Sequence, residues 1–253
     1  FARLPVRTWA EVARVSKPTV VRFCRSMGYD GLADLKLKLV GSVSEGVPFV
    51  HRSVDVDDKA GDVLVKVVDN SVAAFLEYRN AAAHKALEAA AQAILQTWRQ
   101  HQRIVFFGAG NSGMVADDAQ HKFFRLGLTS MSCSDGHVQL MNAALLRRGD
   151  CAVVISNSGL TRDLIAAAEL ARQAGATTIA ITASNSPLAK ACTIHLAADH
   201  PEGYDLYSPM VSRLLHLLII DVLATCVALQ IGPSVQQNSK IIKQLLRSKR
   251  YEQ

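Results

Sequence analysis

Five short apolar runs alternate with helical segments between residues 103 and 197, and this rhythm constrains the fold more than any other feature. The expected strands are 103–107, 128–132, 151–155, 177–182 and 193–197, and the expected intervening helices are 112–126, 138–147 and 161–173. Parallel strands need crossover connections, which helices of this length supply. The pattern therefore predicts an α/β fold with a doubly wound, five-stranded parallel sheet.

Helical segments flank this core on both sides. Residues 62–102 lack Pro and are rich in Ala and Leu, which predicts one or two amphipathic helices. Residues 214–231 are apolar enough to raise the question of a membrane span, but His216 and Asp221 are costly at a bilayer centre. We expect a buried or dimer-forming helix there, with Ile219, Ile220 and Leu223 fitting either role, followed by a basic amphipathic helix over 234–251.

Composition limits the class of protein. The 253 residues are 49 % hydrophobic and 20 % charged, which is typical of globular chains and excludes disorder or a collagen-like repeat. The five cysteines are odd in number and widely spaced, which argues against a disulfide scaffold and against a zinc cluster. We therefore expect a cytoplasmic protein that has no metal site, does not span a membrane and begins without a secretory signal.

Charge is uneven along the chain. Residues 1–52 carry nine Lys or Arg and four Asp or Glu, whereas the remaining residues carry nineteen and eighteen. A compact basic end suggests a small domain that meets a polyanion. We predict a first domain over 1–45, a linker over 46–60 with Gly46, Pro48 and an acidic run, and a second domain over 61–253 whose core is 100–232.

The basic end has the pattern helix, tight turn, helix. Ser16 suits an N-cap and Pro18 the first turn that follows. Val20, Cys24 and Met27 share one face of the second helix, while a polar and cationic face points away. Such a face fits the major groove of DNA. The candidate DNA-binding residues are Lys17, Thr19, Arg22, Arg25 and Ser26.

Arg14 stands where helix-turn-helix motifs usually have Gly, so we expect a left-handed residue there at a cost of about 1 kcal/mol. With Val15-Ser16, Thr19 to Arg25, Gly28-Tyr29, Gly31 and Asp34 to Leu37, the segment resembles the N-terminal domain of the RpiR family of bacterial transcriptional regulators. That domain normally has a further helix upstream, and we expect this chain to begin after it.

A glycine loop follows the first strand. Gly108, Gly110 and Gly113 form the G-x-G-x-x-G pattern between a strand and a helix, and Asp135 lies near the position of an acidic ribose ligand. Taken alone, this loop predicts a dinucleotide site and therefore an NAD(H)-sensing repressor, which stays an open alternative.

A second loop after the third strand favours another ligand. Ser156-Asn157-Ser158-Gly159-Leu160-Thr161 also lies between the carboxyl end of a strand and a helix. Two serine-rich helix N-termini opening on one crevice offer hydroxyl donors and positive dipole ends to a small phosphate. The candidate ligand residues are Gly110, Asn111, Ser112, Ser156, Asn157, Ser158, Gly159 and Thr161.

The paired loops are similar to those of the sugar isomerase (SIS) domain, the phosphosugar-binding fold of isomerases and of RpiR-family regulators. By this resemblance, Ser112, Ser156, Ser158 and Thr161 are expected to hold the phosphate and the adjacent hydroxyls of the ligand. Segments 118–127 and 134–141 are closest to family members that regulate hexose metabolism. The resemblance implies a homodimeric or larger DNA-binding repressor of sugar catabolism that needs no cofactor, with an effector such as 2-keto-3-deoxy-6-phosphogluconate.

An isomerase is the remaining alternative, because SIS domains also catalyse aldose–ketose isomerisation. Such an enzyme needs a base near the reacting carbons of the sugar. His137, Glu169, Glu202 and His216 qualify by residue type, but no motif marks any of them. A DNA-reading domain also suits a metabolic enzyme poorly, so the sequence favours a regulator over an enzyme.

Overall fold

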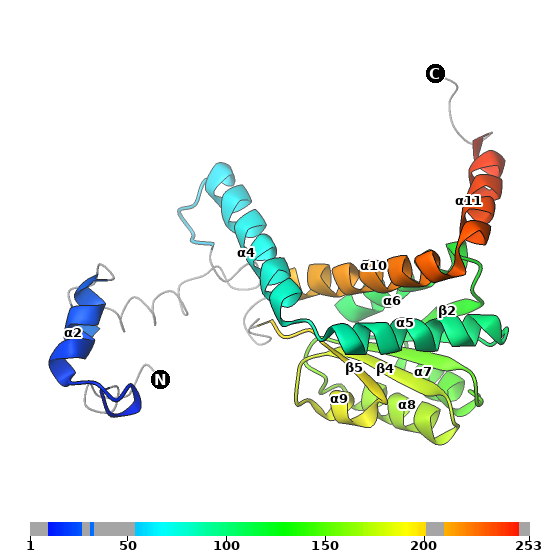
Figure 1. The fold of residues 1–253 in the computed structure, drawn as a ribbon, viewed down its shortest axis with the longest axis horizontal. Helices are drawn as coiled ribbons and strands as arrows, with labels where there is room; N and C mark the ends of the chain where they lie inside the picture. Colours follow the sequence, from blue (N-terminus) through cyan, green and yellow to red (C-terminus); the bar gives the residue numbers. More distant parts are fainter. Residues whose placement is uncertain (1–9, 27–30, 33–53, 201–209, 248–253) are drawn as a thin grey trace. The chain divides into compact units, whose positions relative to one another are not determined.

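The computed structural model describes residues 10–26, 31–32, 54–200 and 210–247. The chain divides into two compact units, and the boundary between Asp69 and Asn70 falls inside one long helix (Figure 1).

The first unit contains the turn and second helix of the expected helix-turn-helix. Helix α2 (Lys17–Ser26) buries Val20 and Cys24 in a small core that also includes Ala10 and Leu32. Met27 and Gly28, assigned above to the packed face and the helix cap, lie outside the described residues.

The turn before α2 has the geometry expected from the sequence. The Ser16 hydroxyl accepts a hydrogen bond from the Thr19 amide at 3.3 Å, which confirms the N-cap. Arg14 has a φ of 54°, so a bulky residue does occupy the left-handed position that glycine usually takes. The substitution of Gly by Arg therefore preserves the turn.

Two helices fill residues 60–99, as the sequence predicts for this stretch. Helix α4 (Ala60–Ala81) and helix α5 (His84–Arg99) are separated by a short break at Ala82 and Ala83. Helix α5 packs on the sheet through Ala90, Ala91 and Ile94.

The second unit is built on a five-stranded parallel sheet with the strand order β2-β1-β3-β4-β5. The strands are β1 (Ile104–Gly108), β2 (Ser130–Cys133), β3 (Cys151–Ser156), β4 (Thr177–Thr182) and β5 (Ile194–Ala197). The helices that follow them are α6 (Asn111–Arg125), α7 (Gly136–Ala144), α8 (Arg162–Gln173), α9 (Pro187–Ala191), α10 (Val211–Ile231) and α11 (Pro233–Leu245). The predicted α/β fold and all five predicted strands are confirmed.

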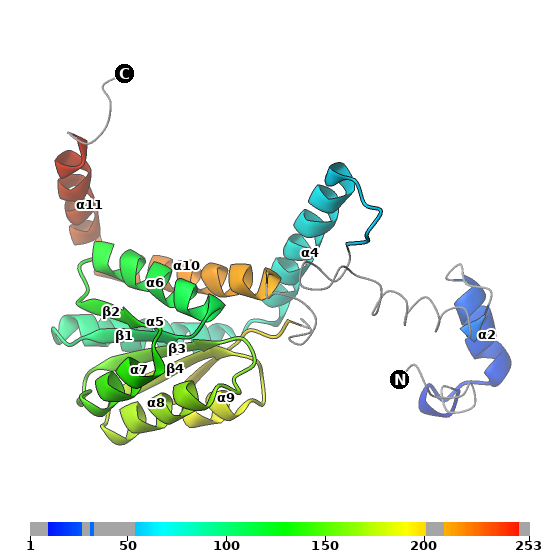
Figure 2. The same cartoon turned by 180° about the vertical axis from the view of Figure 1, so that it is seen from behind.

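Helices cover both faces of the sheet, which is why the central strands are apolar without alternation. β1 and β3 are buried at every position. One core lies between the sheet and α5, α6 and α10, and the other lies between the sheet and α7, α8 and α9 (Figures 1 and 2).

Helix α10 is a core helix. Ile219, Ile220 and Leu223 are fully buried in the first core, so they belong to the monomer's interior and form no dimer surface. Among the described residues, α10 is the one helix long and apolar enough to span a membrane, and its burial against the sheet accounts for its composition.

The start of α7 and the end of α11 are among the helix boundaries that differ from those expected. Helix α7 begins at Gly136, two residues earlier than predicted, because the Asp135 carboxylate accepts a hydrogen bond from the Val138 amide at 3.0 Å and caps it. Helix α11 ends at Leu245, earlier than the predicted Tyr251, which lies outside the described residues.

Candidate functional site

The two serine-rich loops flank the point where the sheet changes direction. β1 and β3 are neighbours in parallel register, with Gly108 opposite Ile155. The chain leaves β1 through α6 toward β2, and leaves β3 through α8 toward β4, on the other face. In doubly wound sheets the ligand crevice lies at such a switch point, beyond the carboxyl ends of the strands.

In the first loop, the backbone of Gly108 lies very close to the backbone at the start of α6. A Cβ on Gly108 would lie 2.2 Å from the Ser112 carbonyl oxygen, so only glycine fits there. Gly110 has a φ of +55° and stands at the N-cap of α6. Asn111 and Ser112 then form the first turn of α6, and both side chains are partly exposed to solvent.

Gln139 on α7 fixes the strand ends on this side. Its side-chain nitrogen donates hydrogen bonds to the carbonyl oxygens of Gly108 and Cys133, each at 2.9 Å. Burial, and more weakly the Asp117 carboxylate, raises the pKa of the Cys133 thiol. That thiol therefore stays protonated at neutral pH and offers no nucleophile to the crevice.

The second loop uses its serines to hold its own turn. Ser156 ends β3 and is buried, and its hydroxyl accepts a hydrogen bond from the Gly159 amide at 3.1 Å. The Ser158 hydroxyl accepts one from the Leu160 amide at 3.2 Å. Because both oxygens act as acceptors here, each hydroxyl proton remains available to donate to an anion in the crevice.

The second loop also packs tightly against the end of β4 and the start of α9. Gly159 has a φ of +64°, and a Cβ there would lie 2.3 Å from the Ser186 hydroxyl and 2.6 Å from that of Thr182. The Gly159 carbonyl accepts a hydrogen bond from the Leu188 amide at 3.2 Å. Thr161 occupies the N-cap of α8, and its hydroxyl makes no capping bond within the described residues.

Three side chains near the strand ends have buried polar atoms without a hydrogen-bond partner. Both polar atoms of the Asn157 amide, the Thr182 hydroxyl and the Gln139 carbonyl oxygen lack partners among the described residues. Buried polar groups are normally satisfied, and exceptions often mark a site for a ligand or an ordered water. Asn157 belongs to the second loop itself, and Thr182 lies opposite Ser156 in the register of β3 and β4.

In the structure, all eight predicted ligand residues therefore lie in or next to the two loops at the carboxyl ends of β1 and β3. The N-termini of α6 and α8 stand at the ends of these loops, with their positive dipole ends. Sequence reasoning missed Gln139 and Thr182. The place of Thr182 at the carboxyl end of a strand was a usable signal, whereas nothing around Gln139 marks it in the sequence.

The residues considered for other functions have different surroundings. Asp135, the candidate ribose ligand, caps α7. Of the candidate bases, His137 and Glu169 are exposed, His216 is buried within α10, and Glu202 lies outside the described residues. Among the described residues, no three His, Cys, Asp or Glu side chains are placed to bind a metal ion.

The candidate DNA-binding residues all lie on α2. Lys17, Arg22 and Arg25 are exposed, and the Thr19 hydroxyl is 2.8 Å from that of Ser16. The Ser26 hydroxyl donates to the Phe23 carbonyl at 2.8 Å and so serves the helix. The cationic face thus points away from Val20 and Cys24, as the helical spacing predicts.

The first unit and the sheet each match a known domain family. Residues 2–46 match the helix-turn-helix domain of the rpiR family, and residues 98–226 match the SIS domain. The described part of each match contains the candidate residues discussed above.

Curated relatives cover most of the chain. It is 40 % identical over 249 residues to the HTH-type transcriptional regulator HexR of Pseudomonas aeruginosa, covering 98 % of this chain and 86 % of that one. It is 45 % identical over 226 residues to the bifunctional protein glk of Burkholderia mallei, covering 89 % of this chain. The chain spans only 35 % of the length of that larger relative.

A solved structure with the same fold is the NanR protein of Vibrio vulnificus complexed with ManNAc-6P. It superimposes with a TM-score of 0.69 at 24 % identity, over 99 % of this chain and 88 % of that one. At this identity the likeness concerns the fold alone.

Proposed function

The chain belongs to the RpiR family of helix-turn-helix regulators with a SIS domain, and from this membership we propose that it is a cytoplasmic, DNA-binding repressor controlled by a phosphorylated sugar. Operator DNA would bind the first unit, and the effector would bind the crevice between the β1–α6 and β3–α8 loops. The protein acts without a cofactor in this proposal.

The observation that carries the proposal is the pairing of two loops at one switch point. The hydroxyls of Ser112, Ser156, Ser158 and Thr161 can donate to an anion, and the N-termini of α6 and α8 add positive dipole ends. A phosphate dianion carries several acceptor oxygens, and it gains a hydrogen bond from each donor it meets. The crevice therefore suits the phosphate end of a small metabolite.

Beyond the phosphate, the effector would be a sugar or sugar acid. The Asn157 amide can both donate and accept, so it suits a hydroxyl or a carboxylate next to the phosphate. The similarity to HexR over nearly the whole chain supports an effector from hexose breakdown, such as 2-keto-3-deoxy-6-phosphogluconate. NanR, of lower identity, is complexed with another phosphosugar, ManNAc-6P.

Control of DNA binding follows from linkage. An effector that binds one arrangement of a homodimer more tightly shifts the population toward that arrangement. The spacing of the two recognition helices then changes, and the affinity for a two-fold operator changes with it. A coupling of this kind typically amounts to about 1–3 kcal/mol.

The NAD(H)-sensing alternative has weaker support. The strand order 2-1-3-4-5 is that of flavodoxin-like sheets, whereas classic dinucleotide-binding sheets have the order 3-2-1-4-5-6. Asp135, which would contact the ribose, is engaged as a helix cap. For the isomerase alternative, the exposed His137 follows β2, but no motif in the sequence marks it as a base.

A thermal-shift screen separates these functions. We expect 2-keto-3-deoxy-6-phosphogluconate at 100 times its Kd to stabilise the fold by about 2.7 kcal/mol, and NADH to leave the melting temperature unchanged. A shift with NADH that disappears in Asp135→Ala would favour the redox sensor. Turnover of a phosphosugar into its isomer, followed by NMR, would instead favour the enzyme.

A further inference from the structure

Helix α4 carries an apolar stripe that no described residue covers. Leu64, Val68, Val72 and Leu76 recur at every fourth position, and their exposed fractions lie between 45 % and 65 %. On the adjoining side of the helix, Tyr78 packs on the core, and burial raises the pKa of its hydroxyl to about 12. The C-terminal part of α4 therefore packs on the core, while the stripe is open to solvent.

The stripe on α4 has an acidic border. Residues 55–76 contain five Asp and two Lys, and one of the lysines, Lys66, pairs with Asp55 at 2.8 Å and Asp58 at 2.6 Å. At about 100° per residue, Asp62 and Asp69 fall just beyond the edge of the stripe. A partner for this surface should be apolar at its centre and basic at its rim.

The C-terminal helix of the same chain has those properties. Leu245 is 71 % exposed on α11 and Phe124 is 60 % exposed on α6, and Ile241 and Leu246 are also open to solvent. A groove of about 670 Å³ runs between the two helices, lined by His121, Phe124, Arg125, Ile242, Lys243, Leu246 and Arg247. We call this the α6–α11 groove.

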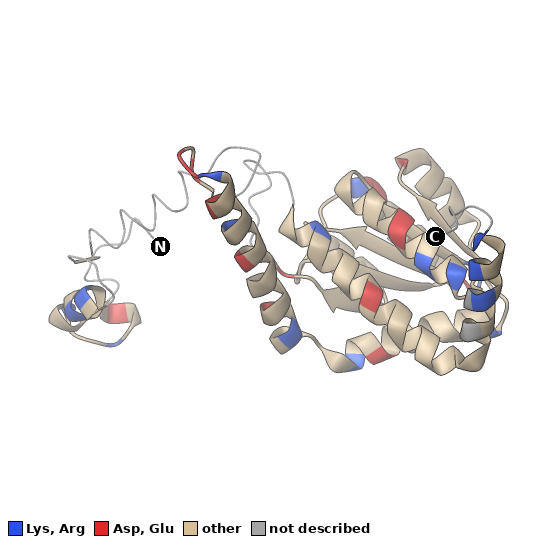
Figure 3. Ribbon diagram, turned by 90° about the horizontal axis from the view of Figure 1, so that it is seen from above, with Lys and Arg blue, Asp and Glu red and all other residues tan. Residues whose placement is uncertain are grey.

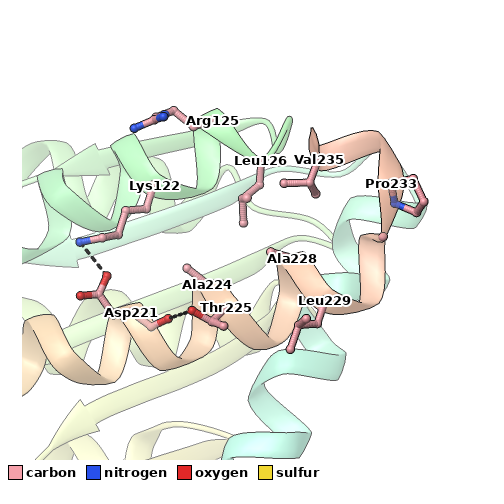
Figure 4. A pocket seen from close by; sticks show the side chains of 11 residues that line it. Lys122, Arg125, Leu126, Asp221, Ala224, Thr225, Ala228, Leu229, Pro233 and Val235 are labelled. Carbon is pink, nitrogen blue, oxygen red and sulfur yellow. Dashed lines mark hydrogen bonds and ion pairs between the residues drawn. The ribbon is translucent and has the colours of Figure 1, made fainter. Parts of the chain in front are cut away.

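A second hollow of about 580 Å³ continues the α6–α11 groove and shares Arg125 with it. Figure 4 shows its apolar wall, with Leu126, Ala228 and Val235 between α6, α10 and α11. On one side of this hollow the Lys122 ammonium is 2.9 Å from the Asp221 carboxylate, and Asp118 also pairs with it. Lys122 lines only this second hollow, and the two carboxylates neutralise it. Arg125 lines both hollows.

The rim of the α6–α11 groove is basic. Residues 233–247 contain Lys240, Lys243 and Arg247 and no Asp or Glu, as the blue segments along this helix in Figure 3 indicate. Arg125 adds to the same rim from α6. The charge is thus opposite in sign to that bordering the stripe on α4.

We propose that the α6–α11 groove binds helix α4 of a second copy of this chain. A groove with an apolar floor suits one amphipathic helix, and the opposite charges at the two borders would set its register. Each copy offers both surfaces, so a two-fold dimer makes the contact twice. This inference rests on the proposed homodimer and names the surfaces that form it.

The proposal gives α4 a role in regulation. Helix α4 runs from the unit with the recognition helix into the unit with the effector crevice. The recognition helices of a dimer would then be tied through α4 to the partner's SIS domain. The spacing of those helices would therefore respond to the crevice.

Sedimentation velocity on the whole chain tests the apolar contact. Leu246→Ser in the groove and Leu76→Ser in the stripe each remove a leucine that is open to solvent, so folding should be unaffected, and the dimer Kd should rise about tenfold or more. The matched control is Leu145→Ser, because Leu145 is 67 % exposed at the end of α7, outside both surfaces. If the wild type forms a dimer and all three variants dimerise with the wild-type Kd, the proposed surfaces are wrong and the homodimer stands.

Charge exchange tests the pairing of the two surfaces. Asp69→Lys and Lys243→Glu should each weaken the dimer, and the double variant should recover most of the loss. Glu169→Lys on α8 is the charge control. Additive losses in the double variant would overturn the pairing of the two surfaces. Filaments of growing length would overturn the two-fold arrangement. A wild-type chain that is monomeric at micromolar concentration would overturn the homodimer itself. Effector binding, measured alongside, reports on the crevice separately.

Discussion

The Gln139 side-chain nitrogen lies 2.9 Å from the carbonyl oxygen of Gly108, across the gap between α7 and the end of β1. The same nitrogen holds the Cys133 carbonyl at the end of β2. One amide therefore joins the two strand ends behind the first loop, and its burial makes these bonds costly to lose.

Replacing this amide should destabilise the fold. We expect Gln139→Leu to lower the free energy of unfolding by about 1–3 kcal/mol, because it leaves two buried carbonyl groups without a donor. Urea denaturation measures the change. Gln173→Leu, at an exposed position on α8, is the control and should stay within about 0.5 kcal/mol of the wild type. An equal loss in both variants would contradict the role given to Gln139.

A methyl group at Gly159 should disturb the second loop. Gly159→Ala places a Cβ 2.3 Å from the Ser186 hydroxyl and imposes a φ of +64° on alanine. The left-handed conformation alone costs about 1 kcal/mol, and the clash requires the loop to move. Calorimetry should show weaker phosphosugar binding, whereas Gly61→Ala, where nothing lies within 4 Å, should bind normally. Normal binding by both variants would show that the loop position is irrelevant.

The thiols of Cys151, which is buried, and Cys192, which is partly buried, should resist alkylation. Burial raises the pKa of Cys151 and of Cys192 to about 12, so at pH 8 very little of either is thiolate. Iodoacetamide followed by peptide mass spectrometry should leave both unmodified in the folded protein and label both in urea. Rapid labelling of Cys151 without denaturant would contradict the packing of β3 in the core.

The cationic face of α2 should contact DNA. Arg22→Ala should leave the melting temperature unchanged because Arg22 is exposed. A guanine contact would cost about 1–3 kcal/mol and relax the preference at one base pair, whereas a phosphate contact would reduce the salt slope by about 1. Lys17→Ala is expected to show the phosphate pattern, and Lys190→Ala on α9 is the control. Fluorescence anisotropy with operator and random DNA at two salt concentrations distinguishes these outcomes, and wild-type binding by both α2 variants would refute the assignment.

Much of this architecture is predictable from sequence because the signals are local. The five strands follow from apolar runs, and the turn at Arg14 follows from the position of Ser16 and Val20. The eight candidate ligand residues follow from serine-rich loops after alternate strands. Each of these features depends on residues that are close together in the chain.

What could not be predicted depends on tertiary contacts. The apolarity of Ile219 and Leu223 suited a dimer surface and a core equally, and only the packing of α10 on the sheet decides for the core. Gln139 reaches Gly108 from 31 residues away. The early start of α7 depends on whether Asp135 is free to cap it, which composition does not reveal.

The central claim is that the β1–α6 and β3–α8 loops together bind one phosphate, and calorimetry on two variants tests it most directly. Ser112→Ala and Ser156→Ala each remove a hydroxyl donor to a charged acceptor, a loss of about 1.5–3 kcal/mol. We predict that each variant binds 2-keto-3-deoxy-6-phosphogluconate about ten to a hundred times more weakly than the wild type, while Ser234→Ala on α11 binds as the wild type does. Unchanged affinity in both Ser112→Ala and Ser156→Ala would contradict the claim.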